Sequence, residues 1–553
     1  MSSTEIMNMI LGMAAGLGLF LYGMDLMSKG MEKVAGSKMK SVLEMCTKNR
    51  FVGVIVGILF TAVIQSSSVT TSMVVSFVNS GLMTLTQAVG PILGANIGTT
   101  ITGQLVSFDL KAIAPVFIFV GVLLILFFKK RMINHIGEIC LGFGVLFFGI
   151  GTMSDAMGAL KKSEEIMEVI KALNNPLLAL LTGFAITAII QSSSATVGII
   201  ITMAAAGVIT ELPMVFFMVL GCNIGSCVTA CIVSLSGKKE AKRTALIHLY
   251  VNIFGSLVIA IILLICGDKI AELIKSTVSG STPEQVMARA VANGHTIFKI
   301  FQVIIMFPFA KIIVKLTQLT IRGEDKKKEG FQLMYISQEQ MTTPSASLIE
   351  VVNEIKRMGK MAADNLQTAF DAMIEKDQAK IDSVYQVEKE VDFLSAEITK
   401  YLVELNQHEF PVKEAKNIAG YFHVVNDLER ISDHAENIAD VGRSRIEEDI
   451  VFSQVGIDEL TDMFDKVMTT VNYSVETFTE QTEAHLKEIV DLEKQVDVLE
   501  KELQHNHVRR LATNECQAKS SIFSDLVSNL ERVSDHATNI AFAIYDQDQY
   551  GLD

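Results

Sequence analysis

One polar tetrapeptide, Gln-Ser-Ser-Ser, occurs twice in this sequence, each time inside a run of uncharged, mostly apolar residues (51–108 and 174–210). Four adjacent polar side chains are costly in lipid unless they face protein, water or a ligand. Serine hydroxyls donate to anion oxygens and accept toward a cation, and a glutamine amide does both. We therefore interpret the two copies as halves of one binding site at the middle of a membrane. The eight residues are Gln65, Ser66, Ser67 and Ser68, and Gln191, Ser192, Ser193 and Ser194.

A second pair of matching segments, 94–99 and 221–226, follows the tetrapeptides. Each offers neutral oxygens beside glycine-loosened backbone, which suit a hard cation such as sodium. No Lys or Arg lies in either tetrapeptide run, so we hypothesise that helix dipoles and co-bound sodium neutralise a bound anion. The alternative is that these side chains only pack helices or bond to their own backbone. The candidate substrate and sodium ligands added by these segments are Asn96, Thr99, Thr100, Asn223 and Ser226.

The tetrapeptides divide their runs into pieces that are too short to cross a bilayer. As helices, residues 51–64 and 69–80 would each span about 20 Å, against a hydrocarbon core of about 30 Å. We therefore expect re-entrant hairpins with the tetrapeptides at their tips. Basic clusters at 29–50, 129–131 and 238–243 mark the cytoplasmic side and place the N-terminus outside. The first residues carry no basic segment, so we expect no cleavable signal peptide.

The two halves of the apolar region also match outside the tetrapeptides, for example 18–23 with 144–149 at the same offset. Each copy has an odd number of full crossings plus one hairpin, so the second copy must be inverted, as in many secondary transporters. We expect repeats at about 8–130 and 137–266 and a final span at about 295–316. A charged linker (321–344) would join this transmembrane domain (1–320) to a second domain (345–553).

The second domain is acidic and polar, has little Gly or Pro, and shows helical periodicity. Segment 428–435 is nearly duplicated at 530–537, and 388–392 at 493–497, which predicts a bundle of two three-helix repeats.

Each duplicated segment of the second domain places a Glu and an Asp at positions i and i+4, on one helix face. Four such pairs could together bind a hard or borderline metal. Alternatively, the adjacent Lys389, Lys494, Arg430 and Arg532 neutralise them. The pairs are Glu388 and Asp392, Glu429 and Asp433, Glu493 and Asp497, and Glu531 and Asp535.

The doubled tetrapeptide inside inverted repeats resembles the sodium/phosphate cotransporter family, whose animal members are the type II sodium–phosphate cotransporters. Over about residues 8–316, this resemblance implies a transporter that couples inorganic phosphate to sodium at the two tetrapeptides. Residues 345–553 are similar to a PhoU domain, with its paired three-helix bundles and Glu-x-x-x-Asp clusters. That resemblance implies a link between phosphate status and transport, and a divalent or trivalent metal at the clusters. The combination resembles the bacterial branch of the family.

The sequence thus predicts an all-α fold: a polytopic membrane protein with inverted repeats and re-entrant hairpins, plus a cytoplasmic helical bundle, in the bacterial plasma (inner) membrane. We expect sodium-coupled phosphate transport controlled by the PhoU-like domain. Catalysis is not expected, since the membrane part shows no nucleophile–base pair and no closed set of metal ligands. The chain has no Gly-x4-Gly-Lys-Ser/Thr loop, so primary active transport by this chain is not expected either.

The expected partners are inorganic phosphate, sodium and the lipid bilayer, with a cytoplasmic regulatory protein or a second copy of the chain, and no nucleic acid. Two alternative functions stay open at this point. One is a membrane-anchored phosphate sensor or scaffold. The other is a transporter of another oxyanion, such as sulfate or arsenate.

Overall fold

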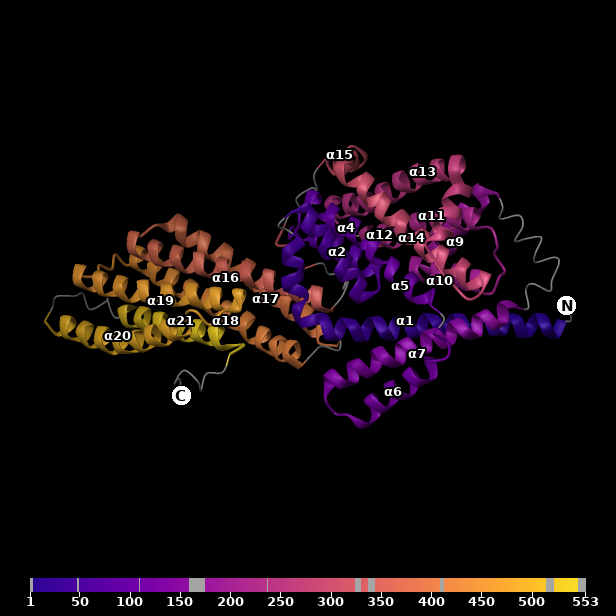
Figure 1. Cartoon of the computed structure of the whole chain (residues 1–553). Coiled ribbons are helices and arrows are strands. Elements are labelled where there is room, and N and C mark those ends of the chain that lie inside the picture. The colour runs from indigo at the N-terminus through magenta and orange to yellow at the C-terminus, as the bar shows by residue number, and fades with distance from the viewer. Residues whose placement is uncertain are drawn as a thin grey trace. The chain divides into compact units, whose positions relative to one another are not determined.

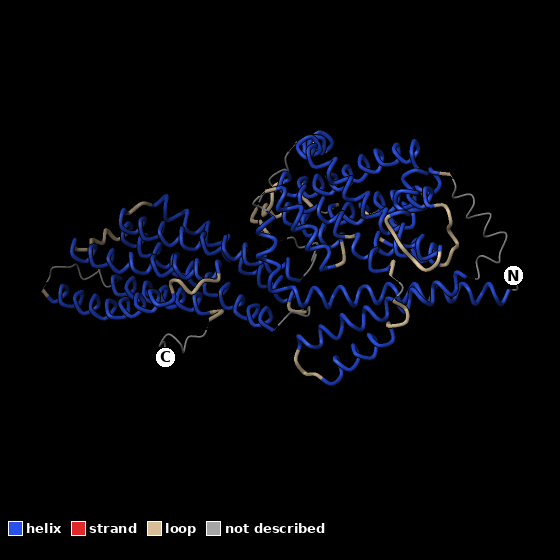
Figure 2. Tube along the Cα trace, viewed as in Figure 1, coloured by secondary structure: helices blue, strands red, loops and turns tan. Residues whose placement is uncertain are grey.

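The computed structural model describes residues 3–46, 49–108, 110–158, 175–235, 237–323, 330–336, 344–407, 412–513 and 522–545. Within these ranges the regular elements are helices and there is no strand, as predicted (Figure 2). The chain divides into two compact units: the first comprises residues 1–326 and 339–346, and the second comprises residues 327–338 and 347–553. The helices are labelled in Figure 1.

The first unit contains two series of helices in the same order: a long helix, a hairpin of two short helices, an interrupted helix and a closing helix. The first series is α1 (Ser3–Cys46), α2 (Arg50–Ile64), α3 (Ser67–Asn79), α4 (Leu85–Gly98), α5 (Thr100–Val106) and α6 (Ala114–Phe127). The second is α7 (Arg131–Gly158), α9 (Pro176–Ile190), α10 (Ser193–Ala205), α11 (Leu212–Gly225), α12 (Cys227–Ser234) and α13 (Lys239–Ser276). After them come α14 (Pro283–Met306), the 3-10 turn η2 (Phe307–Phe309) and α15 (Ala310–Thr320).

The equivalent helices α1 and α7 cross through glycines and display the inverted relation of the two series (Figure 1). A Cβ at Gly23 would lie 2.4 Å from the backbone nitrogen of Leu146, beside Gly142. Gly16 approaches Gly149 in the same way. The earlier glycine of each helix thus meets the later glycine of the other, so the two helices run antiparallel. Each repeat contributes the same close-packing surface, as in a self-complementary twofold interface.

Both hairpins turn at the tetrapeptides. Helices α2 and α9 have 15 residues, and α3 and α10 have 13. Gln65 and Gln191 end the first helix of each pair with left-handed backbone (φ 60° and 58°), a common way to terminate a helix. The next serine then caps the second helix. The predicted hairpins of short helices are therefore present in both repeats.

Several expected spans differ in detail from the structure. The segments after the hairpins are interrupted at Thr99 and at Ser226 rather than continuous. The last span begins at Pro283, ahead of the predicted start, because Thr282 caps the helix before its apolar run begins. Pro308, which has no N–H, lies in the 3-10 turn that separates α14 from α15. The helix before the second basic cluster (129–131), α6, has only 14 residues.

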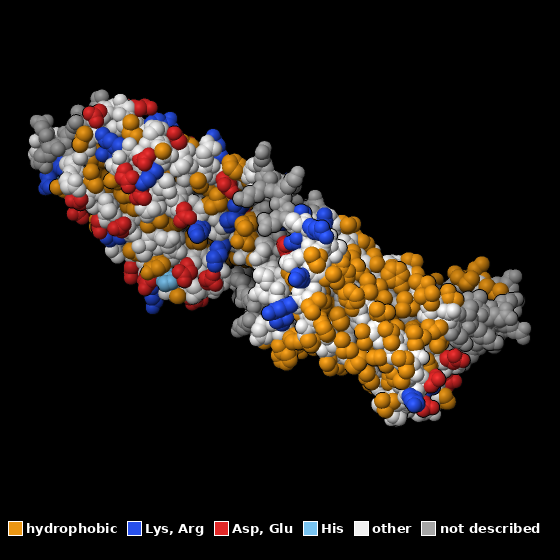
Figure 3. Space-filling view, turned by 90° about the horizontal axis from the view of Figure 1, so that it is seen from above, with side chains coloured by type: hydrophobic (Ala, Val, Ile, Leu, Met, Phe, Trp, Pro, Cys, Tyr) orange, Lys and Arg blue, Asp and Glu red, His pale blue; other side chains and the backbone are white. Residues whose placement is uncertain are grey.

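The first unit is a multi-pass membrane structure by the length and surface of its helices. Figure 3 shows a broad apolar surface, and large apolar side chains such as Phe51, Leu126 and Ile189 are exposed. Such a surface is stable against lipid and not against water. Five helical stretches are long and apolar enough to cross a membrane: Ile6–Val34, Arg131–Gly158, Leu212–Ser234, Lys239–Ser276 and Pro283–Thr320.

The second unit is a bundle of two three-helix groups, as predicted. Phe370 of the first group stacks on Phe464 of the second, with ring centroids 3.8 Å apart. The imidazole rings of His434 and His536, at equivalent positions, have centroids 5.7 Å apart. The groups are α16 (Pro344–Glu375), α17 (Gln378–Leu405) and α18 (Val412–Glu447), and α19 (Gln454–Glu480), α20 (Leu486–Ala512) and α21 (Ile522–Phe542).

Candidate functional site

The two tetrapeptides, one from each repeat, lie against each other. The hydroxyl of Ser68 donates a hydrogen bond to the backbone carbonyl of Gln191 (3.4 Å). The hydroxyls of Thr99 and Ser194 share a second hydrogen bond (2.8 Å), which joins the first repeat to α10 of the second. The structure therefore brings both predicted segments to one place, with the hairpin tips α2–α3 and α9–α10 positioning them.

Each tetrapeptide presents the start of a short helix to this meeting point. Ser66 and Ser192 cap α3 and α10, and their hydroxyls accept hydrogen bonds from backbone N–H groups three residues later (3.2 Å each). Ser67 and Ser193 follow; both are buried, and their hydroxyls make no hydrogen bond within the described ranges. The first N–H groups of a helix have no intrahelical partner and lie at the positive end of its dipole. Both tips can therefore bind anion oxygens.

The two glutamines have different surroundings. Gln65 is 5% exposed; its Oε1 accepts from the hydroxyl of Thr102 (2.8 Å) and its amide nitrogen donates to the carbonyl of Ala62. Gln191 is exposed, and its side chain has no hydrogen-bond partner among the residues that the structure describes. The first glutamine is held by its own repeat, whereas the second is available to a ligand.

The predicted sodium ligands separate into two groups. The hydroxyl of Thr100 donates to the carbonyl of Ile97 (2.8 Å) and that of Ser226 to the carbonyl of Asn223 (2.7 Å), so both bond to their own backbone. Asn223 is 1% exposed, and neither its Oδ1 nor its Nδ2 has a partner. Asn96 is buried too, with its Nδ2 unpartnered. The two asparagines are therefore better placed to meet a ligand than the two hydroxyls.

A buried lysine, Lys299 of α14, lies beside these groups. Its side chain is 2% exposed, and its Nζ donates to Oδ1 of Asn96 (2.6 Å) and to Oδ1 of Asn252 on α13 (3.4 Å). In the described part of the chain no carboxylate lies within 4.0 Å of this ammonium group. A buried charge without a counter-ion is costly, so its retention needs a reason.

The sequence interpretation missed Lys299 because it asked only whether the hairpins contain Lys or Arg. The signal was present, since Lys299 is the one Lys, Arg, Asp or Glu in the stretch 290–310. An ionisable residue in a membrane span marks a functional site by default. Its distance from the tetrapeptides in sequence hid their proximity in space.

A polar network holds the Lys299 region together. Oδ1 of Asn252 also accepts from Nε2 of Gln302 (2.8 Å), and its Nδ2 contacts Sγ of Cys227 (3.1 Å). His295, one turn before Lys299 on α14, is buried with both ring nitrogens unpartnered. The described interior thus contains several polar atoms that await a partner, around one fixed cation.

In the second unit, the predicted Glu/Asp pairs gather into two clusters. Each cluster has one carboxylate oxygen from each of three residues within 4.8 Å of the others. Glu429 and Glu531, the remaining pair members, are not part of these triplets. Several converging carboxylates are the donor set that hard cations prefer, so the clusters fit a divalent or trivalent metal. The triplets are Glu388, Asp392 and Asp433, and Glu493, Asp497 and Asp535.

The carboxylates in these clusters repel one another. Burial, together with Asp392, raises the pKa of Glu388 to about 7. Burial, together with Asp535, raises the pKa of Glu531 to about 7. Nη1 of Arg430 donates to Asp433 (3.2 Å) and neutralises part of the first cluster.

The adjacent histidines take structural hydrogen bonds. Nδ1 of His434 contacts Oδ1 of Asn529 (2.7 Å), and Nδ1 of His536 contacts Oδ1 of Asp427 (2.9 Å). These contacts link α18 to α21, so the histidines hold the two three-helix groups together.

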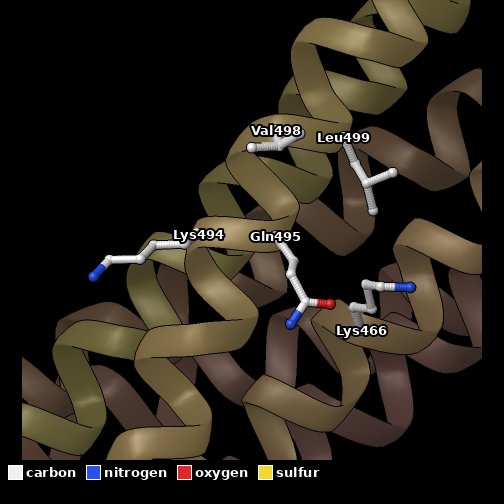
Figure 4. Close-up of a pocket in the computed structure, with 5 residues that line it drawn as sticks. All are labelled: Lys466, Lys494, Gln495, Val498 and Leu499. Carbon is white, nitrogen blue, oxygen red and sulfur yellow. The ribbon is translucent and has the colours of Figure 1, made fainter.

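A pocket on the second unit is distinct from these sites. It is lined by Lys466, Lys494, Gln495, Val498 and Leu499 (Figure 4). Lys494 points away from the other side chains. The lining contains none of the predicted ligands and is mainly apolar, so it is not a candidate for phosphate or metal.

Comparison with known proteins agrees with this geometry. Residues 19–155 and 157–277 match the Na+/Pi-cotransporter family model, and residues 355–441 and 460–544 match the PhoU domain model. YjbB of Salmonella typhimurium, a protein named for inorganic phosphate export, is 24% identical over 542 residues, 97% of this chain and 98% of that protein.

Two further matches cover parts of the chain. The sodium-dependent phosphate transport protein 2A of Mus musculus is 40% identical over 99 residues, 17% of this chain and 15% of that protein. The PhoU structure from Pseudomonas aeruginosa matches with a TM-score of 0.35 and 22% identity, over 36% of this chain and 97% of that one.

The fold and the site define a multi-pass membrane protein built from inverted repeats, of the secondary-transporter type. The chain joins a transmembrane region of the Na+/Pi-cotransporter family to a PhoU domain, and it belongs to this family of phosphate transporters. The resemblance predicted from the sequence is thereby confirmed.

Proposed function

We propose that this protein couples the transport of inorganic phosphate across the bacterial inner membrane to sodium ions. The observation that carries the proposal is the meeting of the two tetrapeptides through Ser68 and Gln191 and through Thr99 and Ser194. A site shared between inverted repeats can open to either side as the repeats exchange conformations. Two helix N-termini and the serine hydroxyls of the tips supply donors for a tetrahedral oxyanion.

Sodium coupling is supported by the amide oxygen of Asn223, which has no partner among the described residues, and by the names of the family and of the mouse relative. Neutral oxygens at the level of the anion can bind a small cation whose charge offsets that of the phosphate. The net direction of phosphate transport then depends on the sodium and phosphate gradients. This is consistent with one relative being named for phosphate export and another for sodium-dependent phosphate transport.

The decisive test is radiolabelled phosphate flux in proteoliposomes, with sodium gradients of either direction and with choline in place of sodium. We expect flux that follows the sodium gradient and collapses in choline. Phosphate binding without flux would favour the sensor or scaffold function instead. Inhibition by sulfate equal to that by unlabelled phosphate would favour a broader oxyanion transporter.

We also propose that the PhoU domain is cytoplasmic and regulates transport, binding a metal at its carboxylate clusters. The chain leaves the first unit beside basic residues: Nζ of Lys239 donates to the carbonyl of Arg322 (3.0 Å), and Arg243 donates to the carbonyls of Ile321 and Gly323. Basic residues concentrate on the cytoplasmic side of membrane proteins. Truncation after Arg322 should preserve sodium-dependent flux and alter its control by phosphate supply. Loss of flux in a well-folded truncated protein would contradict this division of roles.

A further inference from the structure

We propose that Lys299 supplies a fixed positive charge to the phosphate site, in the place of one co-bound sodium ion. The inference rests on the proposed function and concerns how the charge of the anion is balanced. It starts from the finding that Lys299 is buried and bonded only to neutral amide oxygens, those of Asn96 and Asn252.

The hydrogen-bond acceptors of Lys299 are amide oxygens, which can also coordinate a small cation. Amide oxygens in a water-poor interior coordinate sodium in transporters of this architecture. An ammonium group held by Asn96 therefore occupies, in the first repeat, a position suited to a mobile cation. Asn223, the equivalent residue of the second repeat, has no such tethered cation, and both of its amide atoms are unpartnered.

Lys299 is connected to the second tetrapeptide through residues of α4 and the position that follows it. Asn96, its acceptor, lies one helical turn before Thr99 on the same face of the helix. Thr99 in turn shares a hydrogen bond with Ser194 at the tip of the second hairpin. In a low-dielectric interior, a positive charge acts on an anion much more strongly than it does in water.

The neighbouring polar atoms also point to a ligand in this region. Nδ2 of Asn96 and both ring nitrogens of His295 are buried and have no partner among the described residues. Orphaned polar groups of this kind are rare in folded interiors and call for a partner. A ligand that meets the ammonium group of Lys299, the amide N–H of Asn96 and a ring N–H of His295 would be an anion.

The test measures phosphate affinity of the purified full-length protein over a series of sodium concentrations, with choline as replacement. Lys299→Met removes the charge while keeping a long side chain, and Lys299→Arg keeps the charge. Lys311→Met, at an exposed position on α15, is the matched control. We expect Lys299→Met to lower phosphate affinity at low sodium by about tenfold or more, with partial recovery at high sodium. The phosphate affinity of Lys299→Arg should stay closer to that of the wild type, and the affinity of Lys311→Met should equal that of the wild type.

Two results would overturn the inference. The first is a Lys299→Met protein with the phosphate affinity and sodium dependence of the wild type. The second is an equal loss of phosphate affinity in Lys299→Met and Lys299→Arg, which would indicate that the shape of the lysine side chain matters and its charge does not. If Lys299→Met does not fold, Asn96→Asp gives Lys299 a carboxylate partner in place. This variant should weaken phosphate binding, and wild-type affinity in it would overturn the inference.

The same measurements separate the inference from the proposed function. A wild-type protein that binds no phosphate in sodium would overturn both. A wild-type protein with sodium-dependent phosphate binding that Lys299→Met leaves intact would overturn the inference alone.

Discussion

The two repeats of the membrane unit share a backbone but differ in chemistry. Gln65 and Gln191 have nearly the same left-handed backbone, yet Gln65 is buried against Thr102 and Gln191 is exposed. Asn96 accepts a hydrogen bond from Lys299, whereas Asn223 has no side-chain partner. Duplication therefore fixed the positions of the groups, and their surroundings then diverged.

The difference has an identifiable source in α14, which follows both repeats and has no counterpart within them. It brings Lys299 to one asparagine and not to the other. Equivalent residues in inverted repeats are therefore expected to have unequal roles: Asn96 of the first repeat holds Lys299 of α14, and Asn223 of the second repeat is open to a ligand.

The largest expected effect comes from the glutamines themselves. Gln191→Ala should lower phosphate flux by about tenfold or more, because hydrogen bonds to charged groups are worth about 1.5–3 kcal/mol. Gln65→Ala should lower flux and also thermal stability, since it leaves the hydroxyl of Thr102 without its acceptor. Flux and melting temperature of both variants would be measured beside the exposed control Gln318→Ala. An equal loss of thermal stability in the two glutamine variants would contradict the difference between the surroundings of Gln65 and Gln191.

The glycine crossing tests whether the repeats are structurally equivalent. A Cβ at Gly23 would lie 2.4 Å from a backbone nitrogen of α7, and a Cβ at Gly149 would lie 2.5 Å from one of α1. Gly23→Val and Gly149→Val should each destabilise the unit by about 1–3 kcal/mol, the range typical of overpacking. Gly18→Val is the control, because nothing lies within 4 Å of a Cβ there. Thermal unfolding in detergent should show similar losses for the first two variants and little change for the third.

The asparagines should give smaller and opposite changes in stability. Asn96→Ala removes the closer acceptor of Lys299 and should lower thermal stability by about 1–3 kcal/mol. Asn223→Ala removes a buried amide that has no partner, so stability should be unchanged or slightly higher. Its effect should appear instead as a higher sodium concentration for half-maximal flux. Loss of stability in Asn223→Ala with unchanged sodium dependence would contradict a ligand role.

The PhoU domain contrasts with the membrane site, because carboxylates gather there and raise one another's pKa. The pKa of Glu388 and of Glu531 is about 7, against 4.5 for an unperturbed Glu, so the folded state holds more protons between these values. Metal-free stability of this unit should therefore fall slightly as pH rises from about 5 to about 8. A bound divalent cation should remove that trend. The test is the pH dependence of thermal unfolding, measured once with EDTA and once with Mn2+. The double variant Glu388→Gln with Glu531→Gln should reduce the pH dependence that is measured with EDTA.

Local patterns in the sequence carried much of this architecture. The uncharged runs, the hairpins at Gln65 and Gln191 and the two three-helix groups were predicted because each depends on residues close together in the chain. The interruptions at Thr99 and Ser226 were not, because glycine and polar residues weaken a helix without showing where it breaks. The role of Lys299 depends on contacts between α4, α13 and α14, which no local pattern contains.

Part of the candidate site could likewise be predicted from the sequence, and part of it could not. The sequence indicated that the tetrapeptides form one site, and the hydrogen bond between Thr99 and Ser194 supports it. It could not indicate that Thr100 and Ser226 bond to their own backbone while Asn223 stays unpartnered, since these differences depend on packing.

The central claim, one phosphate site built by both repeats, is tested most directly by the stoichiometry of phosphate binding. Calorimetry on the purified protein in sodium should give one phosphate per chain. Gln65→Ala and Gln191→Ala should each weaken that one site rather than remove one of two. Two phosphates per chain, with each substitution abolishing one and sparing the other, would contradict the account.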